Sequence, residues 1–512
     1  MKKKDRCIVI GLDGATFELI NPLIKAGKLP TLKKMIIEGT HGILKSTIPP
    51  LTGPAWVSFA TGKNPGKHGC YDFELPRDSL DEIETINSQD INGPTFYELL
   101  DKKGQKCILI NLPCSYPPRV SEVVITDFLT RGSNFVFPES LIPEIPELNR
   151  YRLVPTHHSN VKKYSNDIRE LERVRFECAQ KLFQKDWDFF FILFQGTDWI
   201  QHKLYHRLIV GKEPDAIQLY EDLDSYIKWF VDNIGKATIL IMSDHGFRTY
   251  KKIFAINRWL IKEGYLKIKQ KRTKNSTHKD RNSFEVPTFF VKHRWLFRVT
   301  SSVYSVSKRI LPPVTPVVRT APDTNSMAYS ILSSANGNCC GIYINSKERF
   351  HNGSVEVKDY EKVRSEIMAK LEQLTDTDGT RILSSVLRRE DVYSGERLNK
   401  APDIFIFSGE YNICPYSEDM TANEHSPDGI FIAYGENIQK GVRISNAEII
   451  DLAPTILHLM KVPIPKDMDG KVLTEIFKEN SEVAQRSIKY QSVDEAVRIK
   501  TKIKELKSLG KI

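Results

Sequence analysis

The sequence predicts an α/β protein, with a mostly parallel central sheet flanked by helices in a three-layer sandwich. Up to about residue 265, short β-rich runs alternate with helical stretches, which is typical of βαβ units. The β-rich runs are continuously apolar, as expected for strands covered on both faces. Two of them end directly in aspartate, at Asp13 and Asp244. Because open α/β sheets place their chemistry at the carboxyl ends of the strands, these aspartates predict the functional edge.

Each element follows from a local pattern. Residues 7–12, 106–112, 188–194 and 237–243 are the predicted strands of the first half. Amphipathic stretches predict helices at 22–39, 165–184 and 214–234. After Tyr329, apolar runs at 339–345, 403–407 and 429–435 predict strands that complete the sheet. One discontinuous catalytic domain is therefore expected over 5–265 and 325–480, with an insert or lid at 266–324 and a Lys- and Glu-rich helical tail at 481–512.

Composition excludes several classes of protein. The chain has 512 residues, of which 40% are hydrophobic and 27% charged, so it is neither disordered nor of low complexity. No run reaches the roughly 18 apolar residues of a membrane-spanning helix. The basic first residues precede a core strand, without the cleavage site of a signal peptide. Eight cysteines without a CxxC pair indicate neither a disulfide scaffold nor a zinc ribbon, and we expect a cytoplasmic protein.

The net charge of +10 is concentrated in one segment. Residues 262–319 contain 14 Lys and Arg against three acidic residues, so the rest of the chain is close to neutral. Aromatic residues lie among these charges. The segment 266–319 is therefore a candidate contact for an anionic membrane surface or a nucleic acid, or it is a solvated loop. A protein that binds a lipid or a nucleic acid and has no catalytic activity is one alternative function.

Six side chains suited to metal binding lie at separate positions along the chain. They are Asp13, Asp198, His202, Asp244, His245 and His425. Asp198 and His202 are spaced i, i+4, so on a helix they share one face. Taken singly, each residue has an ordinary role as a helix cap or a surface contact. Together, three carboxylates and three imidazoles suit two divalent ions, with zinc expected and manganese or iron as alternatives.

A further motif surrounds Thr52. The chain contains, in order, D13-G, T52-G-P54, T61-G62, H68-G69, D198-x-x-x-H202, D244-H245-G246 and H425-S-P-D-G429. This series resembles the alkaline phosphatase superfamily, most closely its type I phosphodiesterase and nucleotide pyrophosphatase branch. The resemblance implies that Thr52 is the nucleophile. It further implies one metal on Asp13, Asp244, His245 and the Thr52 oxygen, and a second on Asp198, His202 and His425.

The resemblance implies a hydrolase of phosphoric esters that acts through a phosphothreonyl intermediate, with phosphodiesters preferred over monoesters. A transferase that moves a phosphoryl-linked head group to an acceptor alcohol is the alternative reaction. Ala55 stands where nucleotide pyrophosphatases usually have Asn, and Thr52 and Trp56 depart from the sulfatase motif at both ends. His68 is expected to make a structural hydrogen bond. Asn257, Asn345 and Arg349 are candidates for lining the pocket, but the sequence identifies no substrate-binding residue, physiological substrate or oligomeric state.

Overall fold

The computed structural model describes residues 6–268, 322–331, 337–416 and 423–492. The basic segment is described only at its ends, and the predicted tail only as far as residue 492. The predictions for 269–321 and for 493–512 therefore lie outside the described residues. Within the described part of the chain, no helix is both long and apolar enough to span a membrane.

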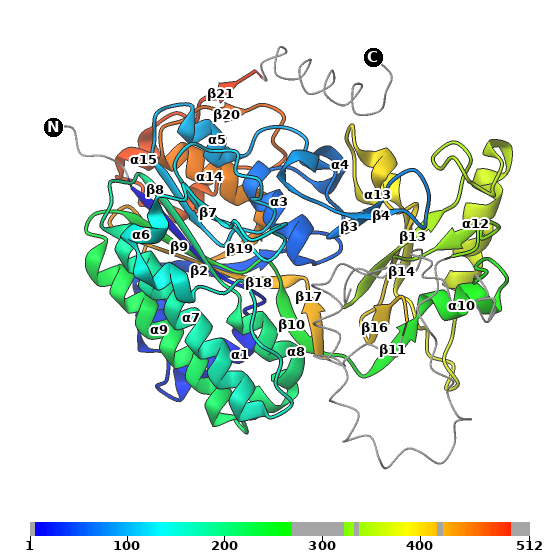
Figure 1. The fold of residues 1–512 in the computed structure, drawn as a ribbon, viewed down its shortest axis with the longest axis horizontal. Coiled ribbons are helices and arrows are strands. Elements are labelled where there is room, and N and C mark those ends of the chain that lie inside the picture. The colour runs from blue at the N-terminus through cyan, green and yellow to red at the C-terminus, as the bar shows by residue number, and fades with distance from the viewer. Residues whose placement is uncertain (1–5, 269–321, 332–336, 417–422, 493–512) are drawn as a thin grey trace.

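A nine-stranded, mostly parallel sheet forms the centre of the larger lobe (Figure 1). Across the sheet the order is β19 (Val442–Glu448), β2 (Thr40–Lys45), β18 (Asp428–Tyr434), β9 (Thr238–Met242), β1 (Cys7–Leu12), β8 (Phe189–Phe194), β5 (Cys107–Ile110), β6 (Val123–Ile125) and β7 (Val136–Phe137). Only β18 and β7 run antiparallel to their neighbours. The predicted fold class is confirmed.

Helices cover both faces of this sheet, because alternate strand residues point to opposite sides. Ile8 and Ile10 of β1 pack in one core, whereas Cys7 and Val9 pack in the other. The first face carries α1 (Phe17–Lys25), α2 (Pro30–Glu38), α7 (Val161–Phe183), α8 (Gly196–Leu208) and α9 (Pro214–Asn233). The second carries α3 (Thr52–Thr61), α5 (Phe96–Asp101) and α14 (Leu452–Leu459). The single helix predicted at 22–39 is wrong: the chain forms α1 and α2, and Gly27 with a φ of 75° lies between them.

A smaller lobe contains a four-stranded sheet, at the right of Figure 1. Its order is β12 (Ala328–Tyr329), β13 (Cys339–Ile344), β15 (Ile404–Phe407) and β14 (Ser385–Arg388), and α10 (Ile256–Lys262) and α12 (Tyr360–Glu372) pack on its core. The prediction that all late apolar runs complete the main sheet is therefore wrong for 339–345 and 403–407. Only the run at 429–435 joins the main sheet, as β18.

The remaining helices and strands are short. These are α4 (Pro65–His68), β3 (Glu74–Pro76), β4 (Ile83–Thr85), α6 (Leu141–Glu144), β10 (Gly246–Thr249), β11 (Lys252–Ala255), α13 (Arg389–Val392), β16 (Tyr411–Cys414), β17 (Asn423–Ser426), β20 (Ile464–Pro465), α15 (Glu482–Gln485) and β21 (Tyr490–Gln491). β10 pairs with β17, and β11 pairs with β16. A separate apolar cluster, which includes Val57, Tyr71, Cys339 and Phe405, packs the lobes against each other.

Candidate metal centre and nucleophile

Two strand ends place the first carboxylates of the site. Asp13 directly follows β1, and Asp244 follows the adjacent parallel strand β9. Both side chains are buried. The backbone N–H of Gly14 donates to Oδ1 of Asp244 at 3.1 Å. Gly14 has a φ of 64°, and a Cβ there would lie 3.3 Å from Asp198 Oδ1 and from His245. A side chain at this turn would crowd the site, which explains the glycine.

His245 joins these carboxylates. Its Nε2 lies 3.6 Å from Oδ1 of Asp13 and 3.3 Å from Oδ2 of Asp244. Its Nδ1 lies 3.0 Å from the carbonyl oxygen of Gly246. Because Nδ1–H can donate to that carbonyl, the lone pair on Nε2 is left facing the carboxylates, which is the arrangement found in metal-binding histidines.

Thr52 reaches the same point from the other face of the sheet. It is the first residue of α3, and its Oγ1 lies 3.3 Å from Nε2 of His245. The N-cap residue, Leu51, has an apolar side chain and so cannot cap the first turn. The N-terminus of α3 therefore directs uncapped peptide N–H groups and its positive dipole end towards the cluster, which favours an anion there.

A second group of ligands lies beside the first. On α8, Nε2 of His202 lies 3.3 Å from Oδ1 of Asp198, as their i, i+4 spacing predicts. The β10–β17 ladder brings in His425, whose Nε2 lies 3.3 Å from the same Asp198 oxygen and 3.0 Å from Nε2 of His202. The rings of His425 and His245 stack with centroids 3.6 Å apart. The two groups thus form one continuous cluster.

Glu424 is a member of this cluster that the sequence reasoning missed. Its side chain is fully buried, and Oε1 lies 3.5 Å from Nδ1 of His202. The only signal in the sequence is its place directly before His425, and adjacent residues of a strand ordinarily point to opposite faces. The packing of α8 against β17 brings His202 to Glu424, and no local pattern in the sequence records this contact.

Burial and like charges shift the pKa values in the acidic half. Burial, with the charges of Asp244 and Asp198, holds the pKa of Asp13 well above its ordinary value. Burial raises the pKa of Asp244 to about 6. Burial and the neighbouring His425 lower the pKa of His245 well below the usual range. These groups resist carrying their charges side by side without a cation between them.

The other half behaves differently. Burial alone would raise the pKa of Asp198, but His202 and His425 hold it well below its ordinary value. Burial would lower the pKa of His202, yet Asp198 and Glu424 hold it well above the usual range. A proton on His202 would offset one of the two carboxylates that face it.

The donor set fits divalent cations. Three groups of side chains bring their ligand atoms within 4.8 Å of one another: Asp13, Asp244 and His245; Asp198, His245 and His425; and His202, Glu424 and His425. One oxygen each of Asp13, Asp198 and Asp244 is buried without a hydrogen-bond partner. Such oxygens are costly unless a cation or water satisfies them. The structure therefore brings all seven residues of the predicted set together, including Thr52, and adds Glu424.

His68 and the three residues predicted as candidates for lining the pocket make hydrogen bonds within the fold. His68 accepts or donates at 2.8 Å with the Ser58 hydroxyl, as expected. Asn257 donates to the carbonyl of Ser330 at 2.8 Å. Asn345 donates to the carbonyl of Ser326 at 2.9 Å, and Arg349 donates to that of Ala401 at 2.6 Å. The last three bonds lie within the smaller lobe, and none of the four involves a residue of the metal cluster.

The chain is similar to one protein family and to several solved structures. A family model described as type I phosphodiesterase / nucleotide pyrophosphatase matches residues 7–428. A phosphonoacetate hydrolase from Sinorhizobium meliloti 1021, in complex with phosphonoformate, has a similar structure, with a TM-score of 0.55 and 15% identity over 90% of this chain and 96% of the other. An inactive variant of murine ectonucleotide pyrophosphatase / phosphodiesterase 5, in complex with AMP, aligns with a TM-score of 0.51 and 11% identity, covering 90% and 96% of the two chains.

These likenesses support different statements. At such low identity the solved structures show a shared fold and no more. The family match extends over most of the chain and indicates an enzyme that hydrolyses phosphoester bonds.

Proposed function

Because the chain belongs to the type I phosphodiesterase / nucleotide pyrophosphatase family, we propose that it hydrolyses phosphodiesters with two divalent cations and a Thr52 nucleophile. The observation that carries the proposal is the convergence of Thr52 Oγ1 with His245 and two orphaned carboxylate oxygens. Asp13, Asp244, His245 and Thr52 would hold one ion. Asp198, His202 and His425 would hold the other, and zinc is the expected metal.

Bound dications would lower the pKa of the Thr52 hydroxyl and neutralise charge on the phosphate and on the departing oxygen. Two dications would neutralise the four carboxylates of Asp13, Asp198, Asp244 and Glu424, so the occupied site would no longer repel a phosphate anion. The N-terminus of α3 adds peptide N–H groups at the same position. His245 is oriented by its Nδ1–H bond to Gly246, which keeps Nε2 facing Thr52.

The proposed reaction has two steps. Thr52 Oγ1 forms a bond to phosphorus, the bond to the leaving alcohol breaks, and the proton lost by Thr52 ends on that alcohol. Water then attacks phosphorus, the bond to Thr52 breaks, and Thr52 regains a proton. An acceptor alcohol in place of water would give transfer, and added alcohols would then appear in the products.

The test combines metal analysis with a substrate panel. We expect two metal equivalents in the wild type and turnover of diesters faster than that of monoesters, pyrophosphates and sulfate esters. Phosphonoacetate belongs in the panel because of the phosphonoacetate hydrolase likeness. Thr52→Ala should lower turnover by roughly 10³-fold or more and keep both metals, whereas Thr52→Ser should retain most of the activity. Equal turnover by Thr52→Ala would overturn the nucleophile assignment.

We also propose a reducing, cytoplasmic location. All eight cysteines are free and buried, which is consistent with a compartment that keeps thiols reduced.

A further inference from the structure

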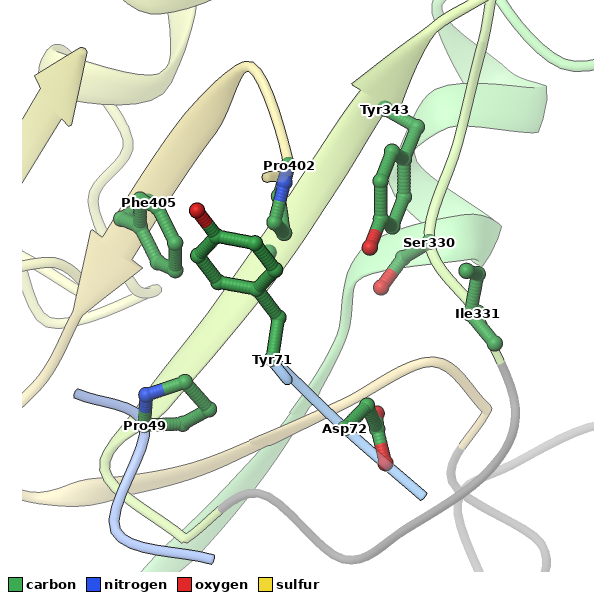
Figure 2. A pocket seen from close by; sticks show the side chains of 9 residues that line it. Pro49, Tyr71, Asp72, Ser330, Ile331, Tyr343, Pro402 and Phe405 are labelled. Atoms are coloured by element: carbon green, nitrogen blue, oxygen red, sulfur yellow. The ribbon is translucent and has the colours of Figure 1, made fainter. Parts of the chain in front are cut away.

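The pocket between the two lobes is too small to hold an organic ligand (Figure 2). Pro49 and Tyr71 line it from the larger lobe and Ser330 from the smaller lobe, and it has room for about one or two water molecules. The Ser330 hydroxyl lies 3.1 Å from Sγ of Cys340, and the Tyr71 hydroxyl donates to the carbonyl oxygen of Arg397 at 3.1 Å. The pocket therefore belongs to the packing of the lobes.

Three polar side chains that the proposed reaction does not use lie directly before metal ligands in the sequence. They are Thr197, Gln201 and Ser243, which precede Asp198, His202 and Asp244 in that order. All three side chains are fully buried. Buried hydroxyl and amide groups are costly unless they make hydrogen bonds, so their partners show what these side chains stabilise.

All three side chains bond to one turn, at residues 13–15. This turn lies beyond Leu12, the last paired residue of β1, so its carbonyl groups have left the ladder of the sheet. Its three successive carbonyl oxygens accept from Thr197 Oγ1 at 2.6 Å, from Gln201 Nε2 at 2.9 Å and from Ser243 Oγ at 2.8 Å. A buried carbonyl outside the ladder needs a partner, and here each partner is the neighbour of a metal ligand.

Two of these bonds connect the two groups of metal ligands. Thr197 and Gln201 are spaced i, i+4 on α8, and so are the ligands Asp198 and His202, so the two pairs form neighbouring stripes of one helix. One stripe carries ligands of the second ion, and the other holds the turn that carries Asp13, a ligand of the first. Because the helix moves as a unit, the bonds from Thr197 and Gln201 fix Asp198 relative to Asp13.

The contact between α8 and this turn is close. A Cβ on Gly14 would lie 3.2 Å from Nε2 of Gln201 and 3.3 Å from Oδ1 of Asp198. When both are ionised, the carboxylates of Asp13 and Asp198 repel each other, which pushes α8 away from the turn. The hydrogen bonds from α8 oppose that movement when no cation lies between the carboxylates.

From this arrangement we infer that Thr197 and Gln201 are positioning residues that set the distance between the two metal ions. The inference rests on the proposed function, because that function supplies the two ions. In two-metal sites the ions lie roughly 3.5 to 4 Å apart, and a misplacement of about 1 Å lowers turnover by up to roughly 100-fold. The separation of the ions is therefore the quantity to measure.

The experiment loads the wild type and each variant with Mn²⁺ and records electron paramagnetic resonance spectra. Two Mn²⁺ ions at such a short distance are exchange-coupled, and their spectrum differs from that of isolated ions. We expect the coupled spectrum in the wild type and its loss in Thr197→Val and in Gln201→Met, which each remove one hydrogen bond and nearly keep the side-chain volume. In both variants kcat for a chromogenic diester should fall by roughly 10- to 100-fold, with KM changed by less than about 2-fold. Thr197→Ser keeps the hydroxyl and should retain the coupled spectrum and most of the turnover.

Thr455→Val is the matched control. Thr455 is also a fully buried helix residue, and its hydroxyl donates to the carbonyl oxygen of Asp451 at 2.6 Å. It lies in α14, on the opposite face of the sheet from α8. Thr455→Val should destabilise the protein about as much as Thr197→Val does, because each leaves one buried carbonyl without its hydroxyl partner. The control should keep the coupled spectrum and kcat of the wild type.

Three results would overturn the inference. They are an unchanged coupled spectrum and kcat in both Thr197→Val and Gln201→Met, an equal loss of coupling in Thr455→Val, and a loss of coupling in Thr197→Ser. If Thr197→Val does not fold, Gln201→Met alone decides.

If the wild type itself shows no coupled pair of ions, the proposed two-ion function fails. Crystal structures of the metal-free proteins then judge the positioning role alone. A displacement of Asp198 from Asp13 in Thr197→Val, absent from Thr197→Ser, supports the inference. Equal positions of the two carboxylates in the wild type and in Thr197→Val refute it.

Discussion

The two halves of the candidate metal centre contain similar residue types but opposite electrostatics. In the acidic half, burial and like charges raise the pKa values of Asp13 and Asp244. In the histidine-rich half, His202 and His425 lower the pKa of Asp198, and Asp198 and Glu424 raise that of His202. The acidic half needs a bound cation, whereas in the histidine-rich half a proton on His202 partly replaces the cation.

This difference in electrostatics explains how the metal centre can stay folded when no metal is bound. A protonated His202 between Asp198 and Glu424 offsets one of these two buried carboxylates. Asp13 and Asp244 have no comparable cation, because burial keeps His245 neutral. We therefore expect the metal-free protein to hold extra protons, and metal binding to release them.

The largest expected effect comes from removing one carboxylate from each half. Asp13→Asn and Asp198→Asn should each lower the bound metal from two equivalents to one, and turnover by roughly 10³-fold. The matched control is Asp232→Asn, an exposed residue of α9 paired with Lys228, which should change neither quantity. Metal content by mass spectrometry and turnover of a chromogenic diester measure the effect. Full retention of two ions in either variant would contradict the division of the ligands.

The next effect concerns Glu424. In metal sites, a carboxylate that accepts from the outer nitrogen of a ligating histidine typically contributes 10- to 100-fold in affinity. Glu424→Gln should therefore weaken the binding of one of the two ions by roughly that factor, measured by calorimetry. The affinity for the other ion should be unchanged. Excess metal should restore kcat, which a general loss of folding would not allow. Glu410→Gln, an exposed residue paired with Lys251, is the control. An equal loss of affinity for both ions would refute the role of Glu424 in positioning His202.

Much of the fold and most of this site could be predicted from sequence. The central strands are continuously apolar and the ligands lie in recognisable spacings, so β1, β8 and β9 and six of the clustered side chains were identified. The edge strand β19, with the sequence VRISNAE, was missed because only some of its residues are buried. The late runs were assigned to the wrong sheet because a strand's pattern does not specify its partner.

The parts that sequence could not provide are contacts between distant segments. Glu424 meets His202 only through the pairing of β17 with β10. The pocket combines Pro49 and Asp72 with Tyr343 and Phe405, which join only when the lobes pack. Local periodicity encodes burial, but it carries no information on such long-range neighbours.

The smallest effect is on the stability of the metal-free protein, and it should have opposite signs in the two halves. The pKa of Asp244 rises to about 6 in the folded state, so between about pH 4 and 6 the folded state binds more protons than the unfolded state. Stability should then fall as pH rises through this window, by up to about 3 kcal/mol, and Asp244→Asn should remove that fall. The pKa of Asp198 is lowered, so its contribution is present above its unfolded pKa and lost in acid. Asp198→Asn should therefore destabilise the protein at pH 7, by roughly 1 to 3 kcal/mol, because it leaves the charge of His202 with one partner fewer. Urea unfolding in chelator at pH 3, 4, 5, 6 and 7 measures both slopes. Equal slopes in the wild type and Asp244→Asn would mean that the acidic half carries no excess charge, and the contrast between the halves would then fail.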